Sequence, residues 1–394
     1  MAKDMTDILN RGVEQVLPSA DGLAKLMQER KIKLYLGIDP TGSQLTLGHA
    51  VVLRKLQQFI EAGHEVILLI GSGTVKIGDP TGKDAMRPML TDEQIKEHFK
   101  DWREQASAIL NFDRLKIVYN GDWLDELKFP DMVKLMAKFT LQQMIERDMF
   151  QDRLAKEQPI HLHELIYPML QGYDSVVLDV DLEIGGNDQL FNMMVGRQLQ
   201  QEMNNREKYV LSVPLLVGSD GRKMGKSLNN FIPLHSSPED LYGRLMSLTD
   251  EVMGDYFRLL TDVPLEEIEQ MEAQIKDGSI NPMDVKKRLA LEITTWLHGA
   301  AAADAAAAHF IKTVQEREIP ADLPKLEVAS NQAVLDLVML TGIPASKSEA
   351  RRLIEQGGVE LNGAKMTEFN ASVDLQTNDV LRVGKRNYFS LRTN

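Results

Sequence analysis

Two short segments of the sequence hold residues suited to binding a polyphosphate. The first, residues 35–49 (YLGIDPTGSQLTLGH), runs from an apolar stretch into a helical one. A helix N-terminus offers a phosphate unsatisfied N–H groups and the positive end of the helix dipole. Thr46 and His49 add side-chain donors, and Gly48 allows close approach of the backbone. Because a capped helix without a ligand would carry the same residues, this segment alone does not decide between the two interpretations.

The second segment, residues 218–229 (GSDGRKMGKSLN), is a glycine-rich loop with no acidic residue after Asp220. It holds three cations and a hydroxyl: Arg222, Lys223, Lys226 and Ser227. A flexible cationic loop of this kind is suited to closing over a polyphosphate. Residues 225–227 (GKS) also match the end of a P-loop, but that motif requires glycine at position 220 and a helix directly after it. Asp220 and the non-helical continuation to Pro233 therefore exclude a P-loop.

The elements that must position these segments alternate between apolar runs and amphipathic stretches. We predict strands at residues 32–38, 66–70, 115–119, 176–180 and 209–217. Helical spacing of apolar residues separates several of them, and strand–helix–strand order is typical of a βαβ unit. The pattern predicts an α/β fold with a doubly wound, Rossmann-like parallel sheet over residues 1–222. A largely helical stretch at about 125–165 is predicted to be an insertion between two halves of the sheet.

Beyond residue 222 the pattern changes. Residues 223–314, which begin with the cationic loop, show helical spacing without a strand run and predict an all-helical domain. Residues 315–330 carry two prolines and mixed charge, and we interpret them as a linker. The last unit, residues 331–394, combines a helix at 348–356 with strand-like runs around an Asn362-Gly363 hairpin turn, which predicts a small α+β domain.

The composition excludes several classes of protein. The 394-residue chain contains no cysteine, which rules out disulfides, thiolate nucleophiles and Cys-ligated zinc. No apolar run approaches the length of a signal peptide or a membrane span, which predicts a cytoplasmic protein. A net charge of −13 disfavours bulk attraction to nucleic acid, but residues 331–394 hold eight Lys and Arg against seven Asp and Glu. Contact with nucleic acid is therefore expected only at local basic patches.

Taken together, the two phosphate-binding segments resemble a known pair of signatures. Residues 46–49 (TLGH) and 223–227 (KMGKS) resemble the HIGH and KMSKS motifs of class I aminoacyl-tRNA synthetases. Thr46 stands where that class has the first histidine, and Gly225 stands where it has serine. Thr46 still supplies a hydroxyl donor for a phosphate.

The residues between and after these signatures are similar to those of the bacterial tyrosyl-tRNA synthetases. The resemblance rests on residues 35–41, 77–83 with Arg87, 167–174 and 185–189, and on residues 347–363, which are similar to an S4-type RNA-binding domain. It extends over nearly the whole chain. It implies an ATP-dependent ligase that converts L-tyrosine to tyrosyl-adenylate with release of pyrophosphate and then transfers tyrosine to the 3′ end of tRNA(Tyr).

The resemblance also implies roles for individual residues. L-Tyrosine would be bound by Tyr35, Asp79, Tyr167, Gln171, Asp174 and Gln189, and ATP or the adenylate by Gly37, Asp39, Gly48, Gly186 and Asp188. The catalytic set would be Thr46, His49, Lys83, Arg87, Lys223, Lys226 and Ser227. Mg²⁺ would be bound through the phosphates of ATP, with no dedicated metal-ligating residues. Glu183 stands where many members have glutamine, and the resemblance gives it no role.

Two macromolecular partners are implied as well. In the S4-like unit, tRNA would contact Lys347, Arg351, Arg352, Lys365, Lys385 and Arg386. A homodimer is the form that the family uses, and the apolar-rich residues 139–150 of the insertion are the candidate contact.

Three other interpretations of these residues are disfavoured. A tryptophanyl-tRNA synthetase would share the catalytic fold, but Tyr35, Asp174 and the S4-like unit favour tyrosine. A non-catalytic RNA-binding protein on the same scaffold is disfavoured because His49 and the loop lysines are intact. Residues 161–164 (HLHE) contain two histidines and an acid, but the third ligand that a metal site needs is not nearby in the sequence.

Overall fold

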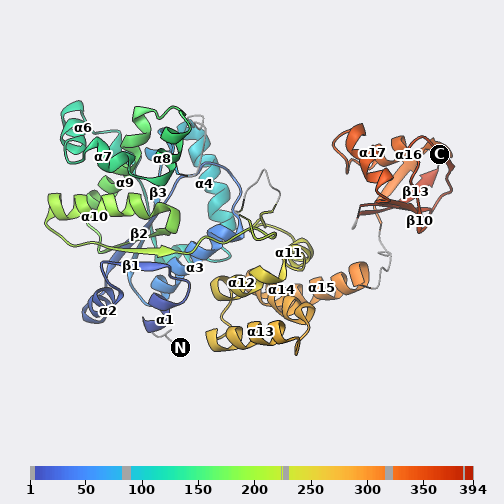
Figure 1. The fold of residues 1–394 in the computed structure, drawn as a ribbon, viewed down its shortest axis with the longest axis horizontal. Helices are drawn as coiled ribbons and strands as arrows, with labels where there is room; N and C mark the ends of the chain where they lie inside the picture. The colour runs from blue at the N-terminus through green and yellow to red at the C-terminus, as the bar shows by residue number, and fades with distance from the viewer. Residues whose placement is uncertain are drawn as a thin grey trace. The chain divides into compact units, whose positions relative to one another are not determined.

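The computed structural model describes residues 5–81, 90–222, 224, 230–315, 323–384 and 387–393 (Figure 1). These residues form two compact units, with the division between Ala303 and Asp304. No helix in the described ranges combines the length and the apolar character that crossing a membrane requires.

The described part of the first unit is built on a six-stranded sheet in the order β1-β6-β5-β2-β3-β4. The strands are β1 (Gln15–Leu17), β2 (Lys33–Ile38), β3 (Glu65–Ile70), β4 (Lys116–Tyr119), β5 (Leu182–Gly186) and β6 (Tyr209–Val213). Neighbouring strands pair in parallel, except β1, which runs antiparallel to β6 at one edge. The predicted α/β fold with a Rossmann-like parallel sheet is thus confirmed.

One of the predicted strands, at residues 176–180, is wrong. Residues 176–178 end helix α9 (Leu162–Leu178), residues 179–181 connect it to the sheet, and the strand begins at Leu182 of β5. A short apolar run fits a buried strand and the buried face of a helix equally well. In α9 the burial of Tyr167, Leu170, Asp174 and Leu178 follows the helical period, and this pattern begins well before residue 176.

Helices connect the strands of the sheet, and α3 and α10 pack against it. They are α1 (Met5–Asn10), α2 (Ala20–Glu29), α3 (Leu47–Glu61), α4 (Asp92–Ala106), α5 (Gly121–Leu124), α9 and α10 (Leu190–Asn204), with 3₁₀ turns η1 (Thr74–Lys76), η2 (Phe112–Arg114) and η3 (Asn187–Gln189). The residues of the predicted insertion are helical, as α6 (Phe129–Met136), α7 (Leu141–Ile145) and α8 (Asp148–Ala155). Leu135 and Met144 of the insertion pack with Met169 and Leu170, which anchors it to α9.

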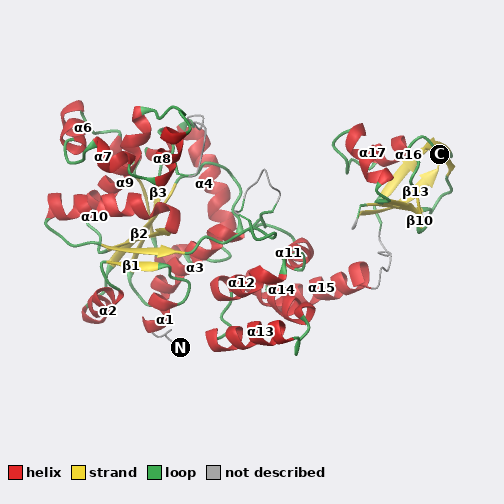
Figure 2. Ribbon diagram, viewed as in Figure 1, coloured by secondary structure: helices red, strands yellow, loops and turns green. Residues whose placement is uncertain are grey.

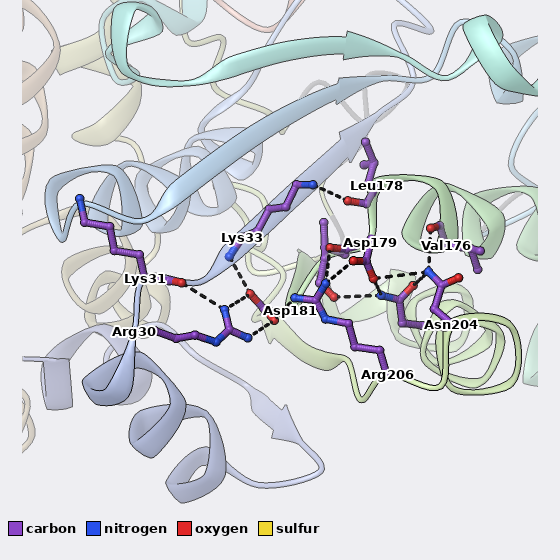
Figure 3. A network of polar contacts seen from close by, with 11 residues as sticks. Arg30, Lys31, Lys33, Val176, Leu178, Asp179, Asp181, Asn204 and Arg206 are labelled. Carbon is purple, nitrogen blue, oxygen red and sulfur yellow. Dashed lines mark hydrogen bonds and ion pairs between the residues drawn. The ribbon is translucent and has the colours of Figure 1, made fainter.

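A buried carboxylate fixes strand β2 against strand β5 at their amino ends (Figure 3). Asp181, just before β5, is 2% exposed and accepts a hydrogen bond from the backbone N–H of Lys33 at 2.8 Å. Arg30 donates to both of its oxygens, at 2.8 and 2.6 Å, and Arg206 donates at 2.5 Å. Burial alone would raise the pKa of Asp181, but these donors together hold it below its usual value.

We expect Asp181→Asn to lower the free energy of unfolding by about 1–3 kcal/mol, because the arginine donors lose their charged acceptor. An unfolded aspartate has a pKa of about 3.9, so the contribution of Asp181 is fully present above that pH and is lost as the pH falls through the lower folded-state value. Urea unfolding of both proteins should therefore show a difference at pH 6 that narrows below pH 4. Asp179→Asn, at a half-exposed position of the same network, is the control and should cost less. An equal difference at pH 6 and pH 2 would contradict the prediction.

The helices that follow the cationic loop belong to the same compact unit up to Ala303. They are α11 (Pro238–Leu245), α12 (Met253–Leu260), α13 (Leu265–Asp277), α14 (Pro282–His298) and the first residues of α15 (Ala300–Phe310), with a 3₁₀ turn η5 (Asp250–Val252), whereas α15 from Asp304 onward and the π turn η6 (Ile311–Gln315) belong to the second unit. Two buried arginines connect the helices after the cationic loop to the sheet domain. Arg11 donates to the carbonyl of Val263 at 2.7 Å, and Arg54 donates to that of Thr261 at 2.9 Å. The division between the two compact units lies at residues 303/304, and no such division falls at 222/223, where the sequence predicted a domain boundary.

The second unit is a small α+β domain (Figure 2). Its elements are β7 (Lys325–Val328), β8 (Asn331–Ala333), α16 (Val334–Leu340), α17 (Lys347–Glu355), β9 (Val359–Leu361), β10 (Ala364–Lys365), β11 (Ser372–Asp374), β12 (Val380–Val383) and β13 (Asn387–Thr393). The described strands form a sheet in the order β10-β9-β12-β13-β7 and a separate pair β11-β8. Because β7 pairs with β13, the predicted linker 315–330 extends too far: residues 325–328 belong to this domain.

Candidate active site

A pocket of about 230 Å³ opens at the carboxyl ends of β2, β3 and β5, the edge at which parallel α/β sheets bind ligands. Among the predicted site residues, those that line it are Tyr35, Gly37, Asp39, His49, Asp79, Tyr167, Gln171, Asp174 and Gln189. Three of them, Tyr167, Gln171 and Asp174, share one face of α9 because they stand four and seven residues apart. The fold thus brings together residues that are distant in the sequence.

Asp174 is a carboxylate of the pocket that is almost fully buried, at 1% exposure. Its Oδ1 accepts a hydrogen bond from Trp123 Nε1 at 2.8 Å, and its Oδ2 accepts one from Asn120 Nδ2 at 3.1 Å. Burial raises the pKa of Asp174 well above its usual range, and these two hydrogen bonds oppose the rise. Because Trp123 Nε1 and Asn120 Nδ2 can only donate, both oxygens of Asp174 act as acceptors here, and each oxygen keeps a second lone pair for a ligand.

Tyr35 of β2 lines the pocket with its side chain fully buried. Its hydroxyl lies 2.9 Å from Ser175 Oγ. Burial raises the pKa of Tyr35 well above its usual value, and the nearby carboxylates of Glu183 and Asp174 raise it further. The hydroxyl of Tyr35 therefore keeps its proton and is available as a donor.

Asp39 is oriented by two hydroxyl donors. Tyr167 Oη donates to its Oδ2 at 2.8 Å, and Thr74 Oγ1 donates to its Oδ1 at 2.8 Å. Gly71 makes room for this carboxylate: a Cβ atom at residue 71 would lie 1.8 Å from Asp39 Oδ1. Only glycine is compatible with this approach.

Asp79 and Gln189 meet on another wall of the pocket. Gln189 Nε2 donates to Asp79 Oδ2 at 2.8 Å, while Thr81 donates to Asp79 Oδ1 from its backbone N–H at 2.9 Å and from its hydroxyl at 2.6 Å. Four carboxylates line the pocket in all, from Asp39, Asp79, Asp174 and Glu183, and no Lys or Arg stands among the lining residues that the structure describes. This electrostatic environment favours a cationic group such as an ammonium.

The N-terminus of α3 faces the same pocket through His49. The backbone N–H of Thr46 donates to His49 Nδ1 at 3.1 Å, and Thr46 Oγ1 lies 2.9 Å from the same nitrogen. Because a backbone N–H can only donate, Nδ1 is an acceptor and the neutral ring carries its proton on Nε2. The ring contacts Trp102 edge to face, at 5.3 Å between centroids, which fixes its plane.

Four predicted site residues lie next to the pocket rather than in its lining. Thr46 is buried behind His49, and a Cβ at Gly48 would come 3.4 Å from Thr46 Oγ1 and 3.5 Å from Met224 Sδ of the cationic loop. A Cβ at Gly186 would lie 2.6 Å from Asp188 Oδ1, so the glycine makes room for that carboxylate. Seven further predicted residues lie outside the described residues: Lys83, Arg87, Lys223, Lys226, Ser227, Lys385 and Arg386.

Comparison with known proteins bears on what such a pocket serves. The family model "tRNA synthetases class I (W and Y)" matches residues 27–315, and the model "Tyrosine--tRNA ligase SYY-like C-terminal domain" matches residues 315–391. The tyrosine–tRNA ligase of Thermotoga maritima is 43% identical over 390 residues, which is 99% of this chain and 97% of the relative. The chain belongs to the tyrosine–tRNA ligases of class I.

Other relatives of the ligase agree with this assignment. The tyrosine–tRNA ligase of Dehalococcoides mccartyi (strain CBDB1) is 45% identical over 384 residues, which is 97% of this chain and 96% of the relative. The fold is similar to that of the tyrosyl-tRNA synthetase of Archaeoglobus fulgidus solved with L-tyrosine, with a TM-score of 0.61 at 22% identity over 77% of this chain and 99% of that one. The tyrosine-specific C-terminal model and the named relatives favour tyrosine over the tryptophan alternative.

The sequence did not reveal several residues that shape the pocket of this ligase. Asn120 and Trp123 follow strand β4 and reach Asp174 from a segment about 50 residues earlier. Their position after a strand, at the ligand-binding edge of the sheet, is the signal that points to them. Thr74 and Ser175 gave no signal of their own, because their role depends on contacts with Asp39 and Tyr35 that only the fold creates.

The two histidines of the HLHE segment lie at the start of α9, with ring centroids 5.8 Å apart. Both oxygens of the Glu164 carboxylate accept hydrogen bonds within the protein: Arg153 donates to Oε2 at 2.5 Å, and the backbone N–H of His161 donates to Oε1 at 2.9 Å. Hydrogen bonding by Arg153 and His161 outweighs burial and lowers the pKa of Glu164. The segment thus has a structural role in starting α9.

The described basic residues predicted to contact RNA lie in the second unit of the ligase. Lys347, Arg351 and Arg352 are exposed on α17, and Lys365 is exposed on β10. The Arg351 guanidinium lies over the Phe369 ring, 5.0 Å from its centroid. The helix therefore presents several cations on one small domain.

Proposed function

We propose that this pocket is where the ligase activates L-tyrosine with ATP, releasing pyrophosphate, before it transfers tyrosine to the 3′ end of tRNA(Tyr). One observation carries the proposal: the buried end of the pocket combines an acceptor, Asp174, with a protonated donor, Tyr35. A phenol hydroxyl donates one hydrogen bond and accepts another, so it would satisfy both groups. Phenylalanine would offer no hydroxyl to the remaining lone pairs of Asp174 or to the proton of Tyr35, which costs binding free energy.

The other end of the amino acid is proposed to meet the acidic wall. Its ammonium would be held by Asp79, Tyr167 and Gln171. Gln171 Nε2 already donates to Glu183 Oε1 at 3.1 Å, which leaves the amide oxygen of Gln171 as an acceptor for an ammonium. Gln189 would hold the carboxylate end.

The proposed reaction is attack of the tyrosine carboxylate on the α-phosphorus of ATP. A bond forms between a carboxylate oxygen and that phosphorus, and the bond from the phosphorus to the bridging oxygen of pyrophosphate breaks. The carboxylate is already ionised at neutral pH, so no general base is needed and catalysis depends on positioning and on donors for the growing charge. In this proposal Gly37, Asp39, Gly48, Gly186 and Asp188 contact the nucleotide. The donors are Thr46, His49, Lys83, Arg87, Lys223, Lys226 and Ser227.

Mg²⁺ is proposed to enter with ATP. In the ranges that the structure covers, no three His, Asp or Glu side chains are arranged to hold an ion. Oxygen ligands for Mg²⁺ would then come from the phosphates and water, which is usual for a nucleotide-bound ion.

The test of this function is ATP–pyrophosphate exchange by the purified protein with single amino acids. Exchange that depends on tyrosine, with phenylalanine and tryptophan far weaker, is the expected result. Exchange with another amino acid in preference to tyrosine would overturn the proposed substrate. Absence of exchange with any amino acid, in a protein that binds tRNA, would overturn the proposed reaction.

The second unit is proposed to bind tRNA through its exposed cations. We expect the triple variant Lys347→Gln/Arg351→Gln/Arg352→Gln to lower the rate of tRNA charging while leaving tyrosine-dependent pyrophosphate exchange at the wild-type rate. The slope of log Kd against log salt concentration should also become shallower, by about 0.7–0.9 for each phosphate that the variant no longer neutralises. A variant that charges tRNA normally at 0.15 M salt would contradict this role.

The ligase is also proposed to be a cytoplasmic homodimer. Its insertion carries large apolar side chains that are exposed in the single chain: Phe129 at 82%, Leu141 at 58% and Val133 at 47%. Large exposed apolar side chains are enriched at interaction surfaces, and these three come from the consecutive helices α6 and α7. Sedimentation equilibrium should give a mass twice that of the chain.

A further inference from the structure

A fully buried lysine lies directly behind the hydroxyl-binding end of the pocket. Lys208, the residue before β6, is 0% exposed, and it forms an ion pair with Glu183, which is 1% exposed. Glu183 lines the pocket, whereas Lys208 stands behind it. A buried charge is costly unless it is paired and hydrogen-bonded, so this pair calls for an explanation beyond packing.

The ammonium of Lys208 reaches the pocket through a chain of contacts. It donates to Ser175 Oγ at 2.8 Å as well as to Glu183 Oε2, and Ser175 Oγ in turn lies 2.9 Å from Tyr35 Oη. The Lys208 nitrogen also stands 5.9 Å from the centroid of the Tyr35 ring. Lys208 is therefore linked to the pocket hydroxyl of Tyr35 by two hydrogen bonds, through Ser175.

The direction of this chain follows from the donors. An ammonium has three protons and no lone pair, so Ser175 must accept from Lys208 and has one proton of its own to give. That proton can go to Tyr35 Oη at 2.9 Å or to Glu183 Oε2 at 3.4 Å, and the shorter contact is the better hydrogen bond. Glu183 needs no proton from Ser175, because Lys208 and Gln171 already donate to its two oxygens. Once Ser175 donates to Tyr35, the hydroxyl proton of Tyr35 is left for another acceptor: either Glu183, whose hydrogen bond helps to raise the pKa of Tyr35, or a ligand in the pocket.

We propose that Lys208 is a positioning residue for substrate recognition. Because its ammonium can only donate, Lys208 sets the direction of the hydrogen bonds that run through Ser175 to Tyr35. Tyr35 then donates its proton into the pocket, to the phenol oxygen of bound tyrosine. The proposal rests on the proposed function of the pocket. Asp174 then accepts a hydrogen bond from the hydroxyl of bound tyrosine. The substrate hydroxyl thus accepts one hydrogen bond, from Tyr35, and donates one, to Asp174. Glu183 provides the countercharge for the ammonium of Lys208: burial lowers the pKa of this lysine, and the charge and hydrogen bond of Glu183 oppose that fall.

A glycine in α10 reserves the space that the ammonium occupies. A Cβ atom at Gly196 would lie 2.5 Å from Lys208 Nζ and 2.7 Å from Ser175 Oγ. The alanine variant would push these two atoms apart without removing any charge. Gly196 thus offers a second way to break the same chain.

The experiment measures pyrophosphate exchange with tyrosine and with phenylalanine. In Lys208→Met, we expect the ratio of kcat/KM for tyrosine to that for phenylalanine to fall about tenfold, through a higher KM for tyrosine. The reason is that the Tyr35 hydroxyl is no longer directed toward the substrate, so that one buried hydrogen bond between neutral groups is weakened. KM for ATP should stay unchanged. Gly196→Ala should also lower the ratio of kcat/KM for tyrosine to that for phenylalanine. If Lys208→Met does not fold, Gly196→Ala tests the proposal by itself.

Two controls separate this role from a loss of stability. Lys55→Met removes another buried lysine, which donates to the backbone carbonyls of Ile8 and Arg11 at 2.7 Å, and Gly22→Ala places a Cβ 2.8 Å from Tyr209 Oη. Both should leave the ratio unchanged even where they lower the unfolding midpoint. A folded Lys208→Met or Gly196→Ala with the wild-type ratio would overturn the proposal. Wild-type protein without tyrosine-dependent exchange would instead overturn the proposed function, and this proposal with it.

Discussion

Replacing Asp174 with asparagine is expected to lower the preference for tyrosine over phenylalanine by about 10- to 100-fold, because leaving a buried hydrogen-bonding group without its partner costs about 1–3 kcal/mol. The carboxylate already accepts hydrogen bonds from Trp123 and Asn120, one on each oxygen. An asparagine keeps one oxygen and turns the other into an NH₂ group, which opposes one of these donors. The amide must then accept from a protein donor and from the substrate on a single oxygen. Binding of tyrosine weakens, while binding of phenylalanine changes much less.

The measurement for Asp174→Asn is kcat/KM in pyrophosphate exchange for both amino acids. Asp181→Asn is the matched control, because Asp181 is another buried aspartate (2% exposed) that lies outside the pocket lining. It should lower the stability and leave the preference intact. If both variants change the preference equally, the effect is general loosening of the domain and the role proposed for Asp174 is wrong.

The sequence predicted the sheet best where the strand pattern was unambiguous. The runs at 32–38 and 66–70 became β2 and β3 within one residue, because predominantly apolar, β-rich runs bounded by turns fit the interior of a parallel sheet. The run at 176–180 failed because its apolar residues belong to the end of a helix whose period starts at Tyr167. The spacing of apolar residues and the length of the segment, examined over a longer window, would have distinguished a buried strand from the end of a helix.

The pocket was predicted to a greater extent than its supporting contacts. Residues that the family resemblance implies, such as Tyr35, Asp174 and Gln189, line one cavity although they come from different segments. Asn120, Ser175 and the Lys208–Glu183 pair could not be foreseen, because hydrogen bonds between side chains 8 to 140 residues apart depend on the packed fold. A single sequence shows which residue types are present, but it does not show which of them meet.

The last prediction concerns the nucleotide end of the site. We expect His49→Ala to lower the rate of tyrosine adenylation about 100-fold, the cost of removing one donor to a developing negative charge, and to leave KM for tyrosine nearly unchanged. The reason lies in the ring's tautomer: Nδ1 accepts from the backbone N–H of Thr46, so the proton on Nε2 is the one that can be offered to a phosphate oxygen. His49 would stabilise the transition state of adenylation. KM for tyrosine should change little, because the residues proposed to bind tyrosine lie elsewhere in the pocket.

Thr46→Ala separates this mechanism from direct contact by the threonine. The backbone N–H that sets the tautomer remains in that variant, so removing only Oγ1, at 2.9 Å from His49 Nδ1, should reduce adenylation much less than His49→Ala does. His98→Ala is the matched control, because His98 Nδ1 lies 2.8 Å from the carbonyl oxygen of Pro40 and its ring is not part of the pocket lining. Single-turnover formation of the adenylate measures all three. A loss in Thr46→Ala as large as that in His49→Ala would mean that the hydroxyl itself binds the phosphate, as the resemblance to the HIGH motif first implied, and that orienting His49 is not its main contribution.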